Sequence, residues 1–376
     1  MIAGLRAAGV EVSECHAPLW TGIEDRVQVA SGRWLGLSFL KRVLSAYKQL
    51  LVNYVALDKD YDVMVLGYPG QLDILVARVL TWLRRKPLVL DLFMSIYLIA
   101  VERELATKSP LSIKLLRWLE SLACRLPDLL ICDTQAYAAW HQYTHRVRPE
   151  KFRLVPTGAD DRLFKPAALV DPSPTDKFKV LYYGTYIPNH GVETIIQAAN
   201  LLKDKPDILF ELIGEGPAKA TAQSLAGRYA LNNVIFTGWL EQDALLEKIV
   251  QAGLMLGVFG VTPQSLMTIQ NKIYESLAMA KPLVTGDSTT VQEALTDRIH
   301  AYLVERANPT ALAEAIEVLH GNRELRRTLS SQGYAHYQRY FTVERIGSVF
   351  KRHLIELVGR AAPQPGKSHE SGQKFF

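Results

Sequence analysis

The chain has 376 residues, of which 48% are hydrophobic and 22% are charged, and its formal net charge is +5 at pH 7. This composition predicts a globular protein of about two domains and excludes an intrinsically disordered chain. The basic excess lies within residues 1–170 and is accompanied by no recognisable nucleic-acid-binding module, so we expect no nucleic-acid partner.

The apolar segments exclude two further classes of protein. The longest apolar stretch, Pro87–Val101, is interrupted by Asp91 and falls short of the ~20 residues that a membrane-spanning helix needs. Met1–Val10 lacks the charged and then apolar pattern of a secretion signal. We therefore expect a cytoplasmic protein.

The cysteines indicate neither a disulfide nor a metal site. They are few, far apart and without a C-x-x-C pair: Cys15, Cys124 and Cys132. This pattern argues against a disulfide framework and against a zinc site. We expect three small buried side chains.

Short apolar segments in the first half predict the strands of a Rossmann-like domain, residues 1–165. The expected strands are Gly9–Cys15, Val63–Leu66, Leu88–Leu92, Leu129–Cys132 and Phe152–Val155.

Between the first two of these strands, Arg33–Val55 predicts an amphipathic helix. The side chains expected on its apolar side are Leu37, Leu40, Leu44, Leu51 and Tyr54, and those on its polar side are Lys41, Arg42, Ser45, Lys48 and Gln49. Trp34 and Phe39 add aromatic side chains of the kind found at membrane interfaces. The helix either binds an anionic membrane surface or is a core helix with a solvated basic face.

The second half alternates strands and helices more regularly. The expected strands are Phe178–Tyr183, Asp207–Ile213, Asn233–Phe236, Leu254–Val258, Pro282–Thr285 and Ala301–Val304. Their apolar character is continuous, which is typical of parallel strands buried on both faces. We expect an α/β fold with two doubly wound domains.

The remaining boundaries follow from composition. The Pro-rich residues 166–177 predict a linker, and the second Rossmann-like domain covers residues 178–335. A C-terminal helix, residues 336–360, is expected to return to the first domain. Residues 361–376 are poor in aliphatic side chains and predict a disordered tail.

Two turns of the second domain have the form of phosphate-binding loops. Gly184–Gly191 follows a strand and precedes a helix, and Gly214–Pro217 follows the next strand at the same edge of the sheet. Such turns direct backbone N–H groups and the positive end of a helix toward an anion. Open α/β sheets bind ligands at this edge.

A third segment, Asn271–Pro282, predicts a helix that runs into a strand, with Lys272 and Glu275 one turn apart. A carboxylate that points into a cleft can accept hydrogen bonds from both hydroxyls of a ribose, and the lysine can meet a diphosphate. The alternative is an exposed ion pair.

These segments, in this order, resemble those of glycosyltransferase family 4 from about residue 178 to 350. The matching motifs are His190-Gly191, Gly214-Glu215-Gly216-Pro217, Val234–Gly238, Glu275–Pro282 and Leu312–Ile316. The first half is similar more loosely, through Asp133-Thr134 and Val155–Asp160.

The resemblance implies a GT-B fold, with two Rossmann-like domains facing across a cleft. It also implies a metal-independent enzyme that retains the anomeric configuration, binds the acceptor in the first domain and binds the donor in the second. Glu275 matches the glutamate that holds the ribose, whereas Met267 stands where the family has the glutamate that contacts the donor sugar. Thr185 and His190 replace the family's phosphate-binding arginine and lysine.

The resemblance assigns a role to each candidate site residue. The donor nucleotide is expected to lie against Gly184, Thr185, His190, Gly191, Gly214, Gly216, Gly238, Lys272 and Glu275. His190 and Lys272 are the expected catalytic groups on the leaving diphosphate. On the acceptor side, where the family often has a histidine, we expect Asp91 and Ser95, although Asp91 is equally a strand-end cap.

The expected function is therefore retaining transfer from a UDP or GDP sugar to a hydroxyl of a saccharide or lipid-linked acceptor. The setting would be bacterial polysaccharide or glycolipid synthesis. No cofactor is expected, and contact with the inner face of an anionic membrane is possible. The alternatives are a sugar-nucleotide epimerase of the same fold and a catalytically silent nucleotide-sugar-binding subunit.

The start of the chain carries one more expectation. Ile2–Val12 resembles the end of the first helix and the second strand of a family 4 enzyme. Since the family's opening strand and glycine loop come before this point, we expect the native protein to begin roughly 20 to 30 residues upstream.

Overall fold

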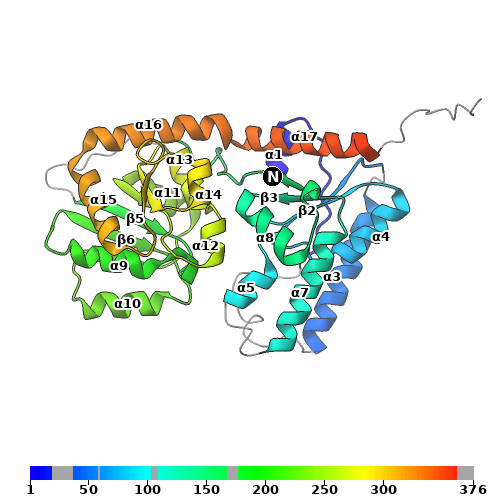
Figure 1. The fold of residues 1–376 in the computed structure, drawn as a ribbon, viewed down its shortest axis with the longest axis horizontal. Coiled ribbons are helices and arrows are strands. Elements are labelled where there is room, and N and C mark those ends of the chain that lie inside the picture. The colour runs from blue at the N-terminus through cyan, green and yellow to red at the C-terminus, as the bar shows by residue number, and fades with distance from the viewer. Residues whose placement is uncertain (19–36, 58–59, 103–108, 167–176, 362–376) are drawn as a thin grey trace, which may run out of the picture.

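The computed structural model describes residues 1–18, 37–57, 60–102, 109–166 and 177–361. It contains two parallel sheets, each the centre of one α/β domain, and the two domains lie side by side (Figure 1). The expected α/β class is confirmed.

The first sheet has the strand order β1-β2-β3-β4, with every neighbouring pair parallel. Its strands are β1 (Met64–Leu66), β2 (Leu88–Asp91), β3 (Leu129–Cys132) and β4 (Phe152–Leu154). Its helices are α1 (Ile2–Ala7), α3 (Leu37–Ala56), α4 (Ile74–Arg84), α5 (Ile96–Glu102), α7 (Pro110–Arg125) and α8 (Gln135–His145), with a 3₁₀ turn η1 (Pro149–Lys151).

Both faces of this sheet are covered. Leu88 and Leu90 of β2 lie in a cluster with side chains of α4, α7 and α8. Val89, which points to the other face, packs with Leu5 of α1 and Phe350 of α17 (Val343–Ala361). The alternation of side chains along β2 thus places helices on each side, and α17 covers a face of the first sheet from the far end of the chain.

The expected strand Gly9–Cys15 is wrong, because residues 10–18 form no helix or strand. Val10 and Val12 instead pack at the edge of the cluster around α1 and α17. Arg6 holds this segment by donating to the carbonyl of Val12 at 3.1 Å and to Glu14 at 2.8 Å. The two valines therefore pack against apolar side chains without belonging to a strand. The described strands of the first sheet follow one another in chain order.

The second sheet has the order β10-β9-β8-β5-β6-β7, also all parallel. Its strands are β5 (Phe178–Tyr183), β6 (Ile208–Ile213), β7 (Val234–Thr237), β8 (Leu254–Leu256), β9 (Leu283–Gly286) and β10 (Tyr302–Val304). Each of the expected strands is present, with ends shifted by at most two residues.

Helices cover both faces of the second sheet as well. They are η2 (Pro188–His190), α9 (Val192–Leu201), α10 (Lys219–Arg228), α11 (Gln242–Gln251), α12 (Pro263–Met267), α13 (Asn271–Ala278), α14 (Thr289–Ala294), α15 (Pro309–Gly321) and α16 (Arg323–Tyr340). Val180 of β5 packs toward α9 and α15, and Leu181 packs toward α11 and α13.

The strand order of the second sheet reverses at β5, which lies between β6 and β8. The chain passes from β5 to β6 and β7, and then returns to β8 on the other side. The loops that follow β5 and β8 therefore start from adjacent strands at the point of reversal, which is the position where doubly wound sheets bind ligands.

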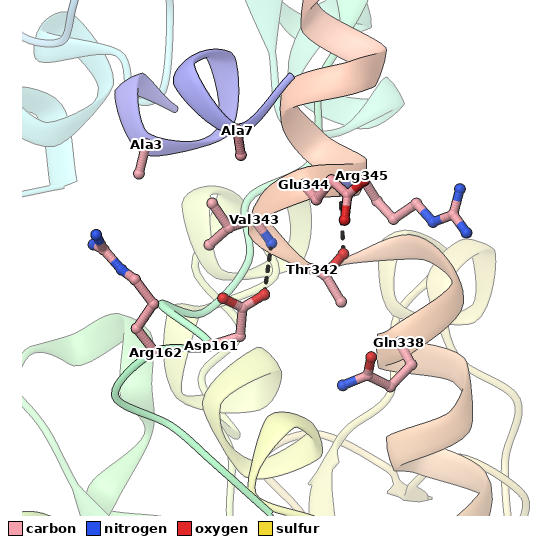
Figure 2. Close-up of a pocket in the computed structure, with 9 residues that line it drawn as sticks. All are labelled: Ala3, Ala7, Asp161, Arg162, Gln338, Thr342, Val343, Glu344 and Arg345. Atoms are coloured by element: carbon pink, nitrogen blue, oxygen red, sulfur yellow. Dashed lines mark hydrogen bonds between the residues drawn. The ribbon is translucent and has the colours of Figure 1, made fainter. Parts of the chain in front are cut away.

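Helices α16 and α17 run one after the other across both domains (Figure 1). Tyr337 of α16 donates to the carbonyl of Ala159 at 3.1 Å, and the amide of Val343 donates to Asp161 at 3.0 Å. A pocket of about 510 Å³ opens at this junction, next to α1 (Figure 2). None of the site residues expected from the sequence lines this pocket.

Candidate functional site

The two glycine turns that follow β5 and β6 are hydrogen-bonded to each other. The amide of Tyr186 donates to the carbonyl of Glu215 at 3.0 Å, and the amide of Ala218 donates to the carbonyl of Tyr186 at 2.9 Å. A Cβ atom on Gly214, where φ is +129°, would lie 2.1 Å from the carbonyl oxygen of Gly184. Only glycine can take this position without displacing the neighbouring turn.

The first turn ends against the loop that follows β8. Gly191 has a φ of +63°, and a Cβ atom there would lie 2.5 Å from the amide nitrogen of Gly260. The amide of Phe259 donates to the carbonyl of His190 at 2.9 Å. The reversal of strand order thus brings these two loops into direct backbone contact.

Lys272 and His190 meet beside the first turn. The Lys272 Nζ lies 3.3 Å from Nδ1 of His190 and 4.3 Å from the centre of the Tyr182 ring. The Tyr182 hydroxyl is 2.7 Å from the same Nδ1. Because the lysine can only donate, we assign Nδ1 as an acceptor and place the imidazole proton on Nε2. A Cβ atom on Gly184 would lie 2.8 Å from the Lys272 Nζ, so the glycine admits the lysine to the turn.

Burial makes this pair of nitrogen bases less basic than usual. It lowers the pKa of Lys272 to about 7, and Glu275 acts in the opposite direction. The pKa of His190 is held well below its usual value, first by burial and then by the charge of Lys272. Both groups would regain their protonated forms beside an anion, because a negative charge favours the charged form of a base.

Glu275 is held on the other side of β5. Its carboxylate accepts a hydrogen bond from the Tyr183 hydroxyl, and burial raises its pKa. Tyr182 and Tyr183 are consecutive on the strand and point to opposite faces, so the first positions His190 and the second positions Glu275. The alternative of an exposed ion pair is wrong, since Lys272 is only 6% exposed.

Two further residues that were expected to contact the donor nucleotide lie next to these turns. Thr185 is exposed and follows Gly184 directly. Gly238 follows β7, and a Cβ atom there would lie 3.3 Å from Oε1 of Glu215. Gly238 therefore lies beside the second turn, with Gly214 and Gly216, whereas His190 and Lys272 are at the first.

On the first domain, Asp91 ends β2 and is nearly buried. Burial raises its pKa to about 7, and a backbone hydrogen bond with Tyr68 opposes this shift. Asp133 follows the neighbouring strand β3, and burial together with the charge of Asp91 raises its pKa to about 7 as well. Both Asp133 carboxylate oxygens are buried and make no hydrogen bond of good geometry within the described residues. Two carboxyl groups of raised pKa thus share one sheet edge, which is typical of functional sites.

Asp133 was not among the site residues expected from the sequence, although its position after an expected strand indicates the same sheet edge as Asp91. Asp91 and Asp133 each follow an expected strand, and parallel neighbours end at the same edge. The register pairs Asp91 with Ile131 of β3, which places Asp133 just beyond it.

Ser95 is occupied elsewhere. Its hydroxyl donates a hydrogen bond to Glu120 at 2.6 Å and accepts one from the backbone amide of Leu98 at 2.9 Å. Ser95 therefore caps the start of α5. The structure does not bring Ser95 together with the donor-side residues.

The domains touch at the position where the donor sugar is expected. The Thr134 hydroxyl donates to the backbone carbonyl of Met267 at 2.6 Å. The amide of Gln264 donates to Glu102 at 2.9 Å. Met267, which stands where the resemblance places a sugar-binding glutamate, therefore contacts the first domain through its backbone.

Residues 170–336 match the family model of the glycosyl transferases group 1. This match covers less than half of the chain and falls on the second α/β domain. The chain is 29% identical over 157 residues to alpha-D-kanosaminyltransferase of Streptomyces kanamyceticus, covering 41% of this chain and 39% of that protein. It is 25% identical over 213 residues to the putative glycosyltransferase EpsD of Bacillus subtilis, covering 55% and 53%. The chain thus spans about half or less of the length of these relatives.

Solved structures share the fold of both α/β domains. HepE of Anabaena in complex with UDP has a TM-score of 0.64 at 18% identity, with 82% of each chain covered. Sucrose-phosphate synthase of Thermosynechococcus elongatus has a TM-score of 0.65 at 19% identity, with 86% of this chain and 79% of that chain covered. The fold is GT-B.

Proposed function

We propose that the chain transfers a sugar from a nucleotide diphosphate sugar, of UDP or GDP type, to a hydroxyl acceptor with retention of anomeric configuration. The observation that carries the proposal is the buried Lys272–His190 pair beside the first of two hydrogen-bonded glycine turns, at the point where the strand order reverses. The solved structures of HepE contain UDP, UDP with glucose, or UDP-glucose, which supports a donor of this class.

In the proposed complex the diphosphate lies against Lys272, His190 and the backbone N–H groups of the first turn. Glu275 accepts hydrogen bonds from the hydroxyl groups of the ribose. As the bond from the sugar C1 to the phosphate oxygen breaks, negative charge grows on the diphosphate, and these donors stabilise it without rearranging. No bound cofactor or metal is needed for this step.

On the acceptor side, Asp91 and Asp133 are the groups that can orient a hydroxyl. The acceptor oxygen forms the new bond to C1 on the face from which the diphosphate leaves. Its proton passes to the departing phosphate oxygen. Ser95 is not retained in this role, because its hydroxyl caps α5.

Two alternatives follow from the same site. An epimerase would convert the donor with no acceptor present. A silent subunit, suggested by Met267 and Thr185, would bind nucleotides without turnover. Both differ from the transferase in one measurable respect: only the transferase consumes donor in proportion to the acceptor supplied.

The test is a panel of UDP and GDP sugars, each incubated with the full chain and an extract of acceptor glycans and lipids. We expect one donor to be consumed only when the extract is present. The glycosidic bond of the product should have the same anomeric configuration as the sugar in the donor. Product of inverted configuration would contradict retention. Donor conversion without the extract would favour the epimerase.

Membrane contact is a further part of the proposal. Among the described residues, no helix is long and apolar enough to cross a bilayer. However, α7 exposes an apolar stripe that consists of Leu111, Leu115 and Trp118. The basic side chains of Lys114 and Arg117 are exposed beside this stripe. Apolar and basic side chains on one helix face are typical of interfacial helices. We propose that this stripe lies on an anionic membrane that carries the acceptor.

The helix expected at Arg33–Val55 is α3, and its residues 33–36 lie outside the described part of the chain. The division of its faces expected from the sequence is wrong. Leu44 and Leu51 are exposed together with Lys41 and Lys48, because Tyr47 turns to the neighbouring α4 and donates to Asp73 at 2.8 Å. The exposed face of α3 thus mixes apolar and basic side chains, as that of α7 does.

A further inference from the structure

Four chemically suited side chains meet between α7 and α8, away from the proposed transfer site. Glu120 and Cys124 lie one turn apart on α7, and His141 and His145 lie one turn apart on α8. All four are at most 2% exposed. One ligand atom each of Cys124, His141 and His145 lies within 4.8 Å of the others.

These distances are close to those of a bound metal ion. In a tetrahedral zinc site the sulfur and nitrogen ligands lie about 3.3 to 3.7 Å from one another. The Cys124 Sγ is 3.9 Å from Nδ1 of His141. Nε2 of His145 is 3.2 Å from Oε2 of Glu120, which is therefore the nearest fourth ligand. Glu120 also accepts hydrogen bonds from the Ser95 hydroxyl and the amide of Ile96, so as a ligand it would use a remaining lone pair.

The hydrogen bonds of His145 leave its Nε2 available. The Ser121 hydroxyl donates to the carbonyl of Arg117 at 2.7 Å, so it can only accept from Nδ1 of His145, which is 2.8 Å away. The proton of a neutral His145 is then on Nδ1, and Nε2 carries a lone pair. A second-shell hydrogen bond of this kind is what metal-ligating histidines usually make.

Two buried nitrogens in this cluster have no hydrogen-bond partner within the described residues. They are Nε2 of His141 and Nε2 of His145, whose contact with Glu120 is not aligned as a hydrogen bond. Leaving such groups unsatisfied is costly, and a metal ion held by Cys124 and Nδ1 of His141 would satisfy Nε2 of His145. The rings of Tyr97, Tyr137 and Trp140 pack around the two imidazoles, which keeps water from doing so.

We propose that Cys124, His141, His145 and Glu120 form a structural metal site that binds one zinc ion. One thiolate and one carboxylate balance the two charges of the ion, and sulfur with imidazole ligands selects zinc over magnesium or calcium. The ion joins α7 to α8, and the N-cap residue of α8 is Thr134, which contacts Met267. From the sequence we expected the three cysteines to be small buried side chains. The proposed role of Cys124 as a metal ligand differs from that expectation.

The test uses the full chain, purified under reducing conditions, with Zn²⁺ measured by elemental analysis and Co²⁺ as a spectroscopic probe. We expect about one zinc per chain, and a cobalt spectrum with intense tetrahedral d–d bands and a sulfur-to-cobalt charge-transfer band. The variants Cys124→Ser and His141→Gln should weaken cobalt binding roughly a hundredfold or more, and Cys124→Ser should lose the charge-transfer band. Cys15→Ser, which alters a cysteine outside the cluster, is the matched control and should change neither.

A folded wild-type chain that holds no zinc and gives no charge-transfer band with cobalt would overturn the proposal. His145 and Glu120 would then be in buried side-chain contact without an ion between them. Cobalt bands that persist unchanged in Cys124→Ser would also overturn it, since they would arise from adventitious ions on surface groups. The wild-type titration decides the matter even if a variant fails to fold.

Discussion

At the scale of single residues, the proposed donor site depends on Lys272, which is buried before any anion arrives, and on Glu275, which is half-buried. Lys272 is 6% exposed, and Glu275 holds a hydrogen bond to Tyr183. Burying an ionisable group costs free energy unless it gains a partner, so such groups are retained where a ligand supplies that partner. The sequence could place these residues on one helix face. It could not show that a tyrosine on β5 fixes each side of the site.

We predict that Lys272→Ala and Glu275→Ala each weaken binding of the nucleotide diphosphate by about 1 to 3 kcal/mol, the scale of a lost hydrogen bond to a charged group. Calorimetric titration with UDP and GDP measures this. The exposed ion pair of Lys205 and Glu317 in the same domain offers matched controls, and Lys205→Ala and Glu317→Ala should leave the affinity unchanged. Full affinity in both site variants would remove these residues from the donor site.

The lowered pKa of Lys272 predicts how binding depends on pH. Because its pKa is about 7 in the free protein, the lysine is charged below pH 7 and neutral above it. A diphosphate favours the charged form and raises the pKa, so above pH 7 binding must take up a proton. We expect affinity to fall by up to roughly tenfold per pH unit between pH 7 and 9.

Titration in buffers of different ionisation enthalpy would detect the uptake of about one proton at pH 8. Lys272→Arg is the matched variant, since a guanidinium stays charged throughout this range and should flatten the profile. A wild-type affinity that is constant from pH 7 to 9 would show that Lys272 does not meet the diphosphate.

At the scale of elements, the strands of the second domain could be predicted because each is a continuous apolar run between turn residues. The same logic failed at Gly9–Cys15, where two valines pack against α1 and α17 and no strand pairs with them. The Cys124 cluster was missed for a different reason. Its ligands lie as i, i+4 pairs on two helices, and no short cysteine motif connects them in the sequence.

We predict that Gly214→Ala disrupts the fused turns. Its Cβ would lie 2.1 Å from the carbonyl oxygen of Gly184, at a φ of +129°. We expect a loss of about 1 to 3 kcal/mol in the free energy of unfolding, together with weaker nucleotide binding. Gly227→Ala on α10 is the control, because a Cβ there meets nothing within 4 Å. It should stabilise the helix by up to about 1 kcal/mol. Thermal and urea unfolding compare the two.

At the scale of the whole molecule, α16 and α17 decide how the domains are held. The first packs on the second domain through Tyr337, and the second packs on the first domain through Phe350 (Figure 1). The junction is fixed by Asp161, which accepts the amide of Val343 (Figure 2). The carboxyls proposed for the acceptor and the pair proposed for the donor therefore belong to separate domains, which are joined by this helix pair and by the contact of Thr134 with Met267.

The last prediction concerns the α7 surface that we propose lies on a membrane. Trp118 and Leu115 on α7 are 60% and 56% exposed, next to Lys114 and Arg117. Single exposed apolar residues are ordinary, but a stripe of them flanked by cations gains both apolar burial and attraction to anionic lipid. Fully burying a large apolar side chain contributes about 1.5 to 3 kcal/mol. Replacing both Leu115 and Trp118 with glutamate should therefore lower partitioning into anionic vesicles by tenfold or more.

Cosedimentation with vesicles of neutral or partly anionic lipid, at low and high salt, measures this partitioning. Wild-type recovery should grow with the anionic fraction and fall as salt shortens the Debye length from about 10 Å at 0.1 M to about 3 Å at 1 M. Ile355→Glu on α17, where the side chain is also 60% exposed, introduces the same charge outside the stripe and should bind like the wild type. If neutral and anionic vesicles recover equal amounts of protein, or if the double variant binds undiminished, the α7 stripe is ordinary surface. The acceptor would then have to reach Asp91 and Asp133 from solution.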